Sequence, residues 1–271
     1  MTSRKCLVVS FGGYTGIAFL GILHALNERN NLESVTHYYG TSIGAIICAL
    51  LAAGLTPFQI FSEFCQQDHV FKPNLLEFIF GDAQSLASFQ PFEHQLCAIF
   101  RKYVNHIPTF SSLAQRGRYL HIYTYSLDSH KMIEFSYTTT PHHNILDPVV
   151  ASAAIPLVFA PKQINDQYYI DGAIINPLPL AEALDNHTPS EMIVVYTEPW
   201  DPIQLQNSKL GALIRTLNLP VHSSFRRASA QITPEMLAIK ITDVNFQITK
   251  PVTLIDKWSV FLRGISVGEA T

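Results

Sequence analysis

The first 55 residues alternate between short apolar runs and stretches of helical length. Residues 6–10 are apolar almost throughout, as in a buried parallel strand, and residues 17–27 place apolar side chains at helical spacing. Residues 35–39 are β-branched and aromatic, which predicts a second strand, and an apolar helix is predicted at 43–54. This strand-turn-helix alternation predicts a parallel sheet with right-handed crossovers.

The remainder of the chain continues this pattern with one irregular interruption. Strands are predicted at 119–125, 131–135, 168–170 and 192–196, and helices at 149–154 and 258–267. Residues 57–112 are rich in phenylalanine and broken by prolines, so we interpret them as a helical insertion covering one end of the sheet. Because no repeat, low-complexity tract or linker occurs, we expect residues 1–271 to form a single α/β domain.

The amino-acid composition excludes several classes of function. Apolar residues make up 48% of the chain and charged residues 14%, below the roughly 25% of a typical soluble domain. The net charge is −3 and no block of Lys and Arg occurs, so a nucleic-acid partner is not expected. The longest apolar segment, 43–55, is too short to span a bilayer, and no signal-peptide core follows Met1. We expect an intracellular, cytoplasmic protein with at most peripheral membrane contact.

The cysteines and histidines do not indicate a metal or a cofactor. Four cysteines are scattered among apolar neighbours, which predicts buried, reduced thiols: Cys6, Cys48, Cys65 and Cys97. The chain lacks the H-E-x-x-H, C-x-x-C and EF-hand patterns. We therefore expect chemistry that needs neither a metal nor a cofactor.

Residues 40–44 match the pattern G-x-S-x-G between a predicted strand and a predicted helix. A serine at such a sharp turn is exposed as a nucleophile, because Gly40 and Gly44 leave out the side chains that would clash. Amides at the start of the following helix favour developing negative charge. We interpret Ser42 as a nucleophile; the alternative is a tight turn with an incidental serine.

A second glycine-rich turn, residues 11–16, joins the first predicted strand to its helix. Its backbone N–H groups could bind phosphate or stabilise an oxyanion. A dinucleotide site is not indicated, because Phe11 stands where the G-x-G-x-x-G fingerprint begins and no acidic residue closes the next strand. The remaining alternative is a turn without a ligand.

A nucleophilic serine needs a base. Asp171 begins an Asp-Gly-Ala sequence after a short predicted strand, although an Asp-Gly pair is usually only a turn. His187 and His222 follow Asp171, so a Ser-Asp-His triad stays open. An α/β-hydrolase, however, has several strands before its nucleophile, and only two are predicted before Ser42.

Four segments in this order resemble the patatin-like phospholipase family: 7–21, 40–44, 151–161 and 171–173. The resemblance covers most of the chain, and the joint pattern is far more specific than any single motif. It implies a three-layer fold with a mainly parallel central sheet flanked by helices. It assigns no catalytic role to residues 151–161.

The resemblance also implies a reaction. It is the hydrolysis of lipid acyl esters of the phospholipase A type, without metal or cofactor, through an acyl-enzyme. Ser42 would be the nucleophile and Asp171 the proton acceptor of a two-residue dyad. The resemblance implies that the amides of Gly12 and Gly13 form the oxyanion hole, and four further glycines support the motifs: Gly16, Gly40, Gly44 and Gly172. Neither dyad side chain is expected to pack in the core.

Two residues depart from the family pattern. Phe11 replaces the first glycine of the loop, and Thr15 stands where the family carries a basic residue. We expect activity to survive because Gly12 and Gly13 remain, with an altered pocket shape and head-group preference. Two alternatives stay open: a Ser-His-Asp esterase and a catalytically impaired homologue that binds lipid.

The expected substrate is a lipid, with phospholipid as the family default and lysophospholipid, galactolipid and neutral glyceride left open. The insertion is crowded with aromatic residues: Phe58, Phe61, Phe64, Phe71, Phe78, Phe80, Phe89 and Phe92. We expect most of them to be core and the others to line an acyl-chain groove or touch a bilayer. Transient contact with a membrane surface is therefore expected.

Overall fold

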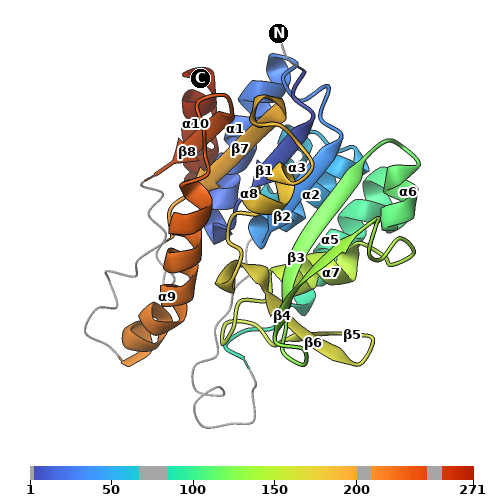
Figure 1. Ribbon diagram of the computed structural model, residues 1–271, viewed down its shortest axis with the longest axis vertical. Helices are drawn as coiled ribbons and strands as arrows, with labels where there is room; N and C mark the ends of the chain where they lie inside the picture. The colour runs from blue at the N-terminus through green and yellow to red at the C-terminus, as the bar shows by residue number, and fades with distance from the viewer. Residues whose placement is uncertain (1–2, 67–84, 200–208, 243–251) are drawn as a thin grey trace.

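The computed structural model describes residues 3–66, 85–199, 209–242 and 252–271, and in these residues one mixed sheet organises the fold (Figure 1). Its strands are β1 (Cys6–Val9), β2 (His37–Thr41), β3 (Tyr119–Ser126), β4 (Lys131–Ser136), β5 (Lys162–Ile164), β6 (Gln167–Asp171), β7 (Met192–Thr197) and β8 (Leu237–Ile241). The strand order is β5-β6-β3-β2-β1-β7-β8, and β4 pairs with β3.

The centre of the sheet is parallel. Strand β1 pairs in parallel with both β2 and β7, and the parallel set extends to β3 on one side and β8 on the other. All four residues of β1 are fully buried, as expected for a strand covered on both faces. Strand β3 also pairs antiparallel with β4 and β6, and β6 pairs antiparallel with β5.

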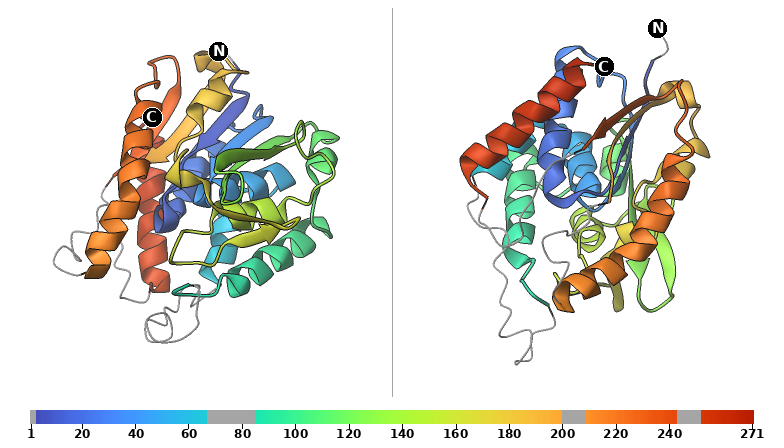
Figure 2. Two further views of the ribbon diagram at one scale, coloured as in Figure 1. Left: turned by 60° about the horizontal axis from the view of Figure 1, so that its bottom comes forward. Right: turned by 90° about the vertical axis from the view of Figure 1, so that its left-hand side faces the viewer.

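Helices cover both faces of the sheet, with α1 and α10 on one face and α9 on the other (Figure 2). The α-helices are α1 (Gly16–Glu28), α2 (Ile43–Ala53), α3 (Pro57–Cys65), α5 (Gln90–Val104), α6 (Phe110–Ala114), α7 (Leu146–Ser152), α8 (Leu180–Leu184), α9 (Lys209–Ser229) and α10 (Leu254–Glu269). Short 3-10 turns are η1 (Gly13–Thr15), η2 (Gly172–Ile174) and η3 (Pro189–Glu191). The fold class expected from the sequence, an α/β fold with a mainly parallel sheet between helices, is confirmed.

Helices α1 and α10 run parallel in unusually close contact. A Cβ added at Gly21 would lie 2.1 Å from the carbonyl oxygen of Phe261, and one at Gly264 would lie 2.1 Å from that of Ala18. Near the other end, Arg29 Nη2 donates to the carbonyl of Glu269 at 2.8 Å. The two helices therefore begin at the same end of the molecule, which is the end where β1 leads into α1.

Several elements differ from the sequence-based predictions. Strands β5 and β8 and helices α8 and α9 were not predicted, and the helix predicted at 149–154 spans Leu146–Ser152. Cys6 and Cys48 are buried as expected, whereas Cys65 and Cys97 are only half-buried. The prediction of one domain over residues 1–271 stays a prediction.

The insertion at 57–112 is helical in its described parts, where it forms α3, α5 and α6. Of the phenylalanines expected there, Phe71, Phe78 and Phe80 lie outside the described residues. Among the others, Phe61 is fully buried against Phe261, whereas Phe58 is 42% exposed. The remaining three are half-buried: Phe64, Phe89 and Phe92. Within the described ranges, no helix has both the length and the apolar character needed to cross a membrane.

Candidate active site

Strands β2 and β6 meet end to end along one edge of β3. Thr41, the last residue of β2, pairs with Tyr123, and Asp171, the last residue of β6, pairs with the next residue, Thr124. Both strands lie on the same edge because β4 occupies the other edge of β3 at these positions. Since β2 is parallel and β6 antiparallel to β3, their carboxyl ends point toward each other. This topology brings together residues 42 and 171, which are far apart in sequence.

Ser42 occupies the sharp turn between β2 and α2. It lies just past the carboxyl end of its strand, as predicted, and has φ 57° and ψ −126°, a conformation rare for any residue with a side chain. In this turn the backbone at Gly40 and Gly44 lies very close to other backbone atoms, and glycine permits this because it has no side chain. A Cβ on Gly40 would lie 2.5 Å from the carbonyl oxygen of Gly44, and one on Gly44 would lie 2.2 Å from that of Val9.

The Ser42 hydroxyl donates a hydrogen bond of 2.6 Å to Oδ2 of Asp171. The other carboxyl oxygen, Oδ1, accepts the amide of Ala173 at 2.8 Å. Ser42 is 5% exposed and Asp171 is 3% exposed, so both side chains are buried, contrary to the expectation that neither packs in the core. Burial raises the pKa of Asp171 to about 7, although the hydrogen bonds from Ser42 and Ala173 oppose this shift. A carboxyl group in this state can accept a proton near neutrality.

The last residue of α7 and the residues just after it anchor both members of this pair. The Ser152 hydroxyl accepts the amide of Ser42 at 3.0 Å and donates to the carbonyl of Tyr123 at 2.7 Å. Two residues later, the carbonyl of Ala154 accepts the amide of Asp171 at 2.9 Å. Sequence reasoning assigned no role to this segment, because its partners lie 110 and 29 residues away from Ser152.

Gly172 allows Asp171 to sit this close to β3. A Cβ on Gly172 would lie 2.3 Å from the carbonyl oxygen of Tyr123, the same carbonyl that accepts the Ser152 hydroxyl. Any other residue at position 172 would push the end of β6 away from its partner strand.

The glycine-rich loop lies next to the nucleophile turn. A Cβ on Gly16 would meet the side chain of Ile43 at 2.3 Å, so the start of α1 touches the residue that follows Ser42. Gly12 precedes η1, and Gly13 has φ +52°. The amide of Phe11 donates to the carbonyl of Pro177 at 2.9 Å. The Phe11 amide is therefore already engaged.

The histidines considered as alternative bases lie elsewhere. The ring of His187 is 4.5 Å from that of His37, which pairs with Cys6 at the amino-terminal end of the sheet, opposite Ser42. His222 is on α9. Among the residues that the structure describes, no histidine forms a hydrogen bond with Ser42 or Asp171. The geometry gives the Ser-His-Asp alternative no support.

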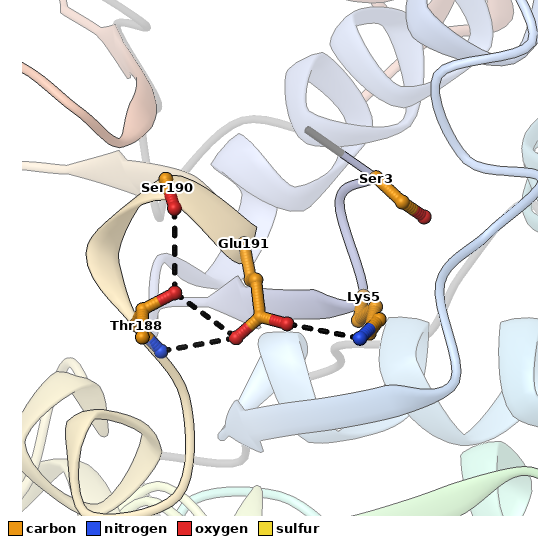
Figure 3. Close-up of a pocket in the computed structure, with 5 residues that line it drawn as sticks. All are labelled: Ser3, Lys5, Thr188, Ser190 and Glu191. Atoms are coloured by element: carbon orange, nitrogen blue, oxygen red, sulfur yellow. Dashed lines mark hydrogen bonds and ion pairs between the residues drawn. The ribbon is translucent and has the colours of Figure 1, made fainter. Parts of the chain in front are cut away.

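A separate surface pocket of about 350 Å³ lies at the amino-terminal end of the sheet (Figure 3). It is lined by Ser3, Lys5, Thr188, Ser190 and Glu191, and an ion pair of 3.1 Å joins Lys5 to Glu191. Hydrogen bonds from Thr188 hold the other carboxyl oxygen of Glu191. These groups satisfy one another, and the pocket is remote from Ser42. Within the described ranges, no three His, Cys, Asp or Glu side chains are arranged to hold a metal ion.

Sequence comparison places the chain in a family. The sequence profile of the patatin-like phospholipase family matches residues 7–184. A curated relative, the "Probable lipid hydrolase 463L" of Invertebrate iridescent virus 6, is 32% identical over 188 residues, which cover 68% of this chain and 64% of the viral protein. The chain belongs to the patatin-like phospholipase family, as its motifs predicted.

Solved structures show the same fold at low sequence identity. VipD from Legionella pneumophila matches with a TM-score of 0.57 and 17% identity, over 99% of this chain and 66% of VipD. ExoU, in its complex with SpcU from the type III secretion system of Pseudomonas aeruginosa, matches with a TM-score of 0.55 and 17% identity, over 99% of this chain and 51% of ExoU. The chain thus spans between half and two thirds of the length of these relatives.

Proposed function

We propose that the protein hydrolyses the acyl ester bond of a lipid, with Ser42 as nucleophile and Asp171 as its base. The observation that carries this proposal is the buried 2.6 Å hydrogen bond from the Ser42 hydroxyl to Asp171, together with the pKa of that carboxyl raised to about 7. A carboxylate with an ordinary pKa of about 3.9 would be a weak base at neutral pH. The burial of Asp171 removes this difficulty.

The reaction proceeds in two halves. As the Ser42 oxygen attacks the acyl carbonyl, Asp171 takes the hydroxyl proton, and it returns the proton to the departing alcohol when the ester bond breaks. A water molecule then gives its proton to Asp171 and attacks the acyl-enzyme. Release of the fatty acid restores the Ser42 hydroxyl, which regains its proton from Asp171.

The amides of Gly12 and Gly13 are proposed to stabilise the oxyanion that forms in each half. Their loop touches the residue after Ser42 through the Gly16–Ile43 contact, and the neighbouring amide of Phe11 is bound to Pro177. Loss of one such donor typically lowers the rate on the order of 10²–10³-fold. Phospholipid is the proposed substrate, of the phospholipase A type.

The enzyme is also proposed to contact a lipid surface transiently. Four exposed apolar side chains line helix α10, and we term them the α10 surface: Leu254 (50% exposed), Ile255 (80%), Trp258 (39%) and Leu262 (56%). Because α1 and α10 run parallel, the first turn of α10 lies at the same end of the molecule as the glycine-rich loop. Apolar groups exposed at this end would favour contact with a membrane.

The proposal is tested by labelling and turnover. The wild type should react with a fluorophosphonate probe at Ser42 and release fatty acid from a panel of phospholipid, lysophospholipid and glyceride substrates. Ser42→Ala and Asp171→Asn should each abolish nearly all activity, and the double variant should be hardly worse, because the residues act as a unit.

His187→Ala and His222→Ala serve as controls and should stay within a few fold of the wild-type rate. A histidine variant as inactive as Ser42→Ala would contradict the dyad and favour a triad. A wild-type protein that binds lipid but neither reacts with the probe nor releases fatty acid would instead be a catalytically silent homologue.

A further inference from the structure

The Ser152 hydroxyl occupies the point where the β2–β3 ladder breaks. Up to Thr41 the two strands are paired in register, and at Ser42 the chain leaves the sheet with φ 57°. At this point the Ser152 hydroxyl lies between the amide of Ser42, at 3.0 Å, and the carbonyl of Tyr123, at 2.7 Å. The Ser152 hydroxyl thus satisfies both the Ser42 amide and the Tyr123 carbonyl. Without it, these two backbone groups would have to hydrogen-bond to each other directly.

This bridge lies in a fully enclosed position. Ser152 is 0% exposed and Ser42 is 5% exposed, so water has little access to either group. A buried backbone amide without a partner is costly, and a chain that loses such a bond moves to regain one. The rare backbone conformation of Ser42 is therefore held in part by a side chain from another element.

The same short segment also holds Asp171. The carbonyl of Ala154 accepts the Asp171 amide at 2.9 Å, two residues after Ser152. The segment therefore contacts the backbone of both members of the pair, whose side chains meet at 2.6 Å.

We propose that Ser152 is a positioning residue for the reaction. Its hydroxyl holds the backbone of Ser42 at the position along β3 from which the Ser42 side chain reaches Asp171. The expected effect of Ser152 on catalysis rests on the proposed function. Ser152 touches neither substrate nor the reacting oxygen, and acts only through the Ser42 amide. Small displacements of a reacting group, of about 1 Å, can lower a rate on the order of 10²-fold.

The test compares Ser152→Thr with Ser152→Val. Both variants add the same bulk at a fully buried site, and only threonine keeps the hydroxyl. We expect Ser152→Thr to retain most of kcat, and Ser152→Val to lose on the order of 10²-fold in kcat with little change in KM. The rate of fluorophosphonate labelling should fall in the same proportion.

A second comparison separates positioning from general stability. Ser126 is also 0% exposed, and its hydroxyl accepts the backbone amide of Ser129 at 3.1 Å, whereas neither Ser42 nor Asp171 is a partner in that bond. Ser152→Ala and Ser126→Ala should lower Tm similarly, but only Ser152→Ala should lower kcat. The pH dependence should also move, because the hydrogen bond from Ser42 lowers the pKa of Asp171. If Ser42 shifts away, the rising limb of kcat/KM should move to higher pH in Ser152→Ala and Ser152→Val, but not in Ser152→Thr or Ser126→Ala.

Equal kcat in Ser152→Val and Ser152→Thr, or in Ser152→Ala and Ser126→Ala, would overturn the proposal. Crystal structures of the Thr and Val variants decide it independently of turnover. The Ser42–Asp171 distance should exceed about 3.5 Å, the limit of a hydrogen bond, only in the Val variant. An unchanged distance in Ser152→Val would refute the positioning role. An inactive, unlabelled wild type would refute only the proposed function.

Discussion

The ring of Phe11 packs edge-on against the ring of Phe225 on α9, with centroids 6.2 Å apart and planes at 67°. The side chain that departs from the family pattern thus points toward the face of the sheet covered by α8 and α9. The nucleophile turn leads into α2, whose first residue touches Gly16 at the start of α1. Phe11 therefore joins α9 to the start of the glycine-rich loop, and its backbone amide is held by Pro177.

Restoring the family's glycine at this position should weaken the fold more than the reaction. Phe11→Gly removes the contact with Phe225 and adds backbone freedom, so we expect the free energy of unfolding to fall by about 2–4 kcal/mol. The kcat/KM of the folded variant should stay within a few fold, because Gly12 and Gly13 keep their amides. Denaturant unfolding and turnover measure the two effects. A tenfold loss of kcat without a loss of stability would place Phe11 in the reaction site instead.

The activity should depend on pH through Asp171. Only the ionised carboxylate can take the Ser42 proton, and burial raises its pKa to about 7. We expect kcat/KM to rise with pH through about 7 and then level off. An Asp with an ordinary pKa of about 3.9 would instead give a flat profile from pH 5 to 8. A pH series with a soluble short-chain ester distinguishes the two outcomes.

The buried carboxyl should also lower the stability of the wild type as pH rises. Its pKa is about 7 in the folded protein against an ordinary 3.8, so the folded state binds the proton more tightly. This contribution is fully present below about pH 4 and is lost as pH rises to about 7. Asp171→Asn, which cannot ionise, should therefore become more stable than the wild type across this window, by on the order of 2–4 kcal/mol above pH 7. Thermal unfolding of both proteins from pH 4 to 8 measures the difference, and parallel Tm curves would contradict it.

The α10 surface should matter only when the substrate is part of a lipid surface. Ile255→Asp places a charge at its most exposed position and should reduce binding to phosphatidylcholine vesicles and hydrolysis of their lipid several fold. Hydrolysis of a soluble short-chain ester should not change. Ser266→Asp is the matched control, because it adds the same charge at an exposed, polar position of the same helix. If the two variants bind vesicles equally well, the α10 surface does not contact lipid.

Local patterns predicted the elements that build the site, because each leaves a compact signal in the sequence. The buried strand β1, the turn at Ser42 and the apolar helix α2 are contiguous segments with strong apolar and glycine signals. Helix α9 was missed because Pro220 interrupts it, and proline normally ends a helix. Strand β5, with only three residues, is too short to show a period.

The properties of the dyad depend on contacts that no local pattern records. The role of Ser152 arises from a backbone amide 110 residues earlier in the chain. The raised pKa of Asp171 arises from burial, which is set by how β6, η2 and the segment after α7 close around it. The sequence therefore indicated the nucleophile and its base, but not the tuning of that base or the side chain that holds the nucleophile in place.

The position of β7 in the sheet limits how far the chain can be shortened from its carboxyl end. The family match ends at residue 184, yet β7 (Met192–Thr197) lies directly beside β1 in the middle of the sheet. A fragment ending at 184 would leave β1 as an open edge, with unpaired backbone groups and apolar side chains that were fully buried. Such edges recruit strands from other copies, so we expect this fragment to aggregate. The segment that matches the family is therefore shorter than the segment that folds. Deletion series should keep the chain at least through β7.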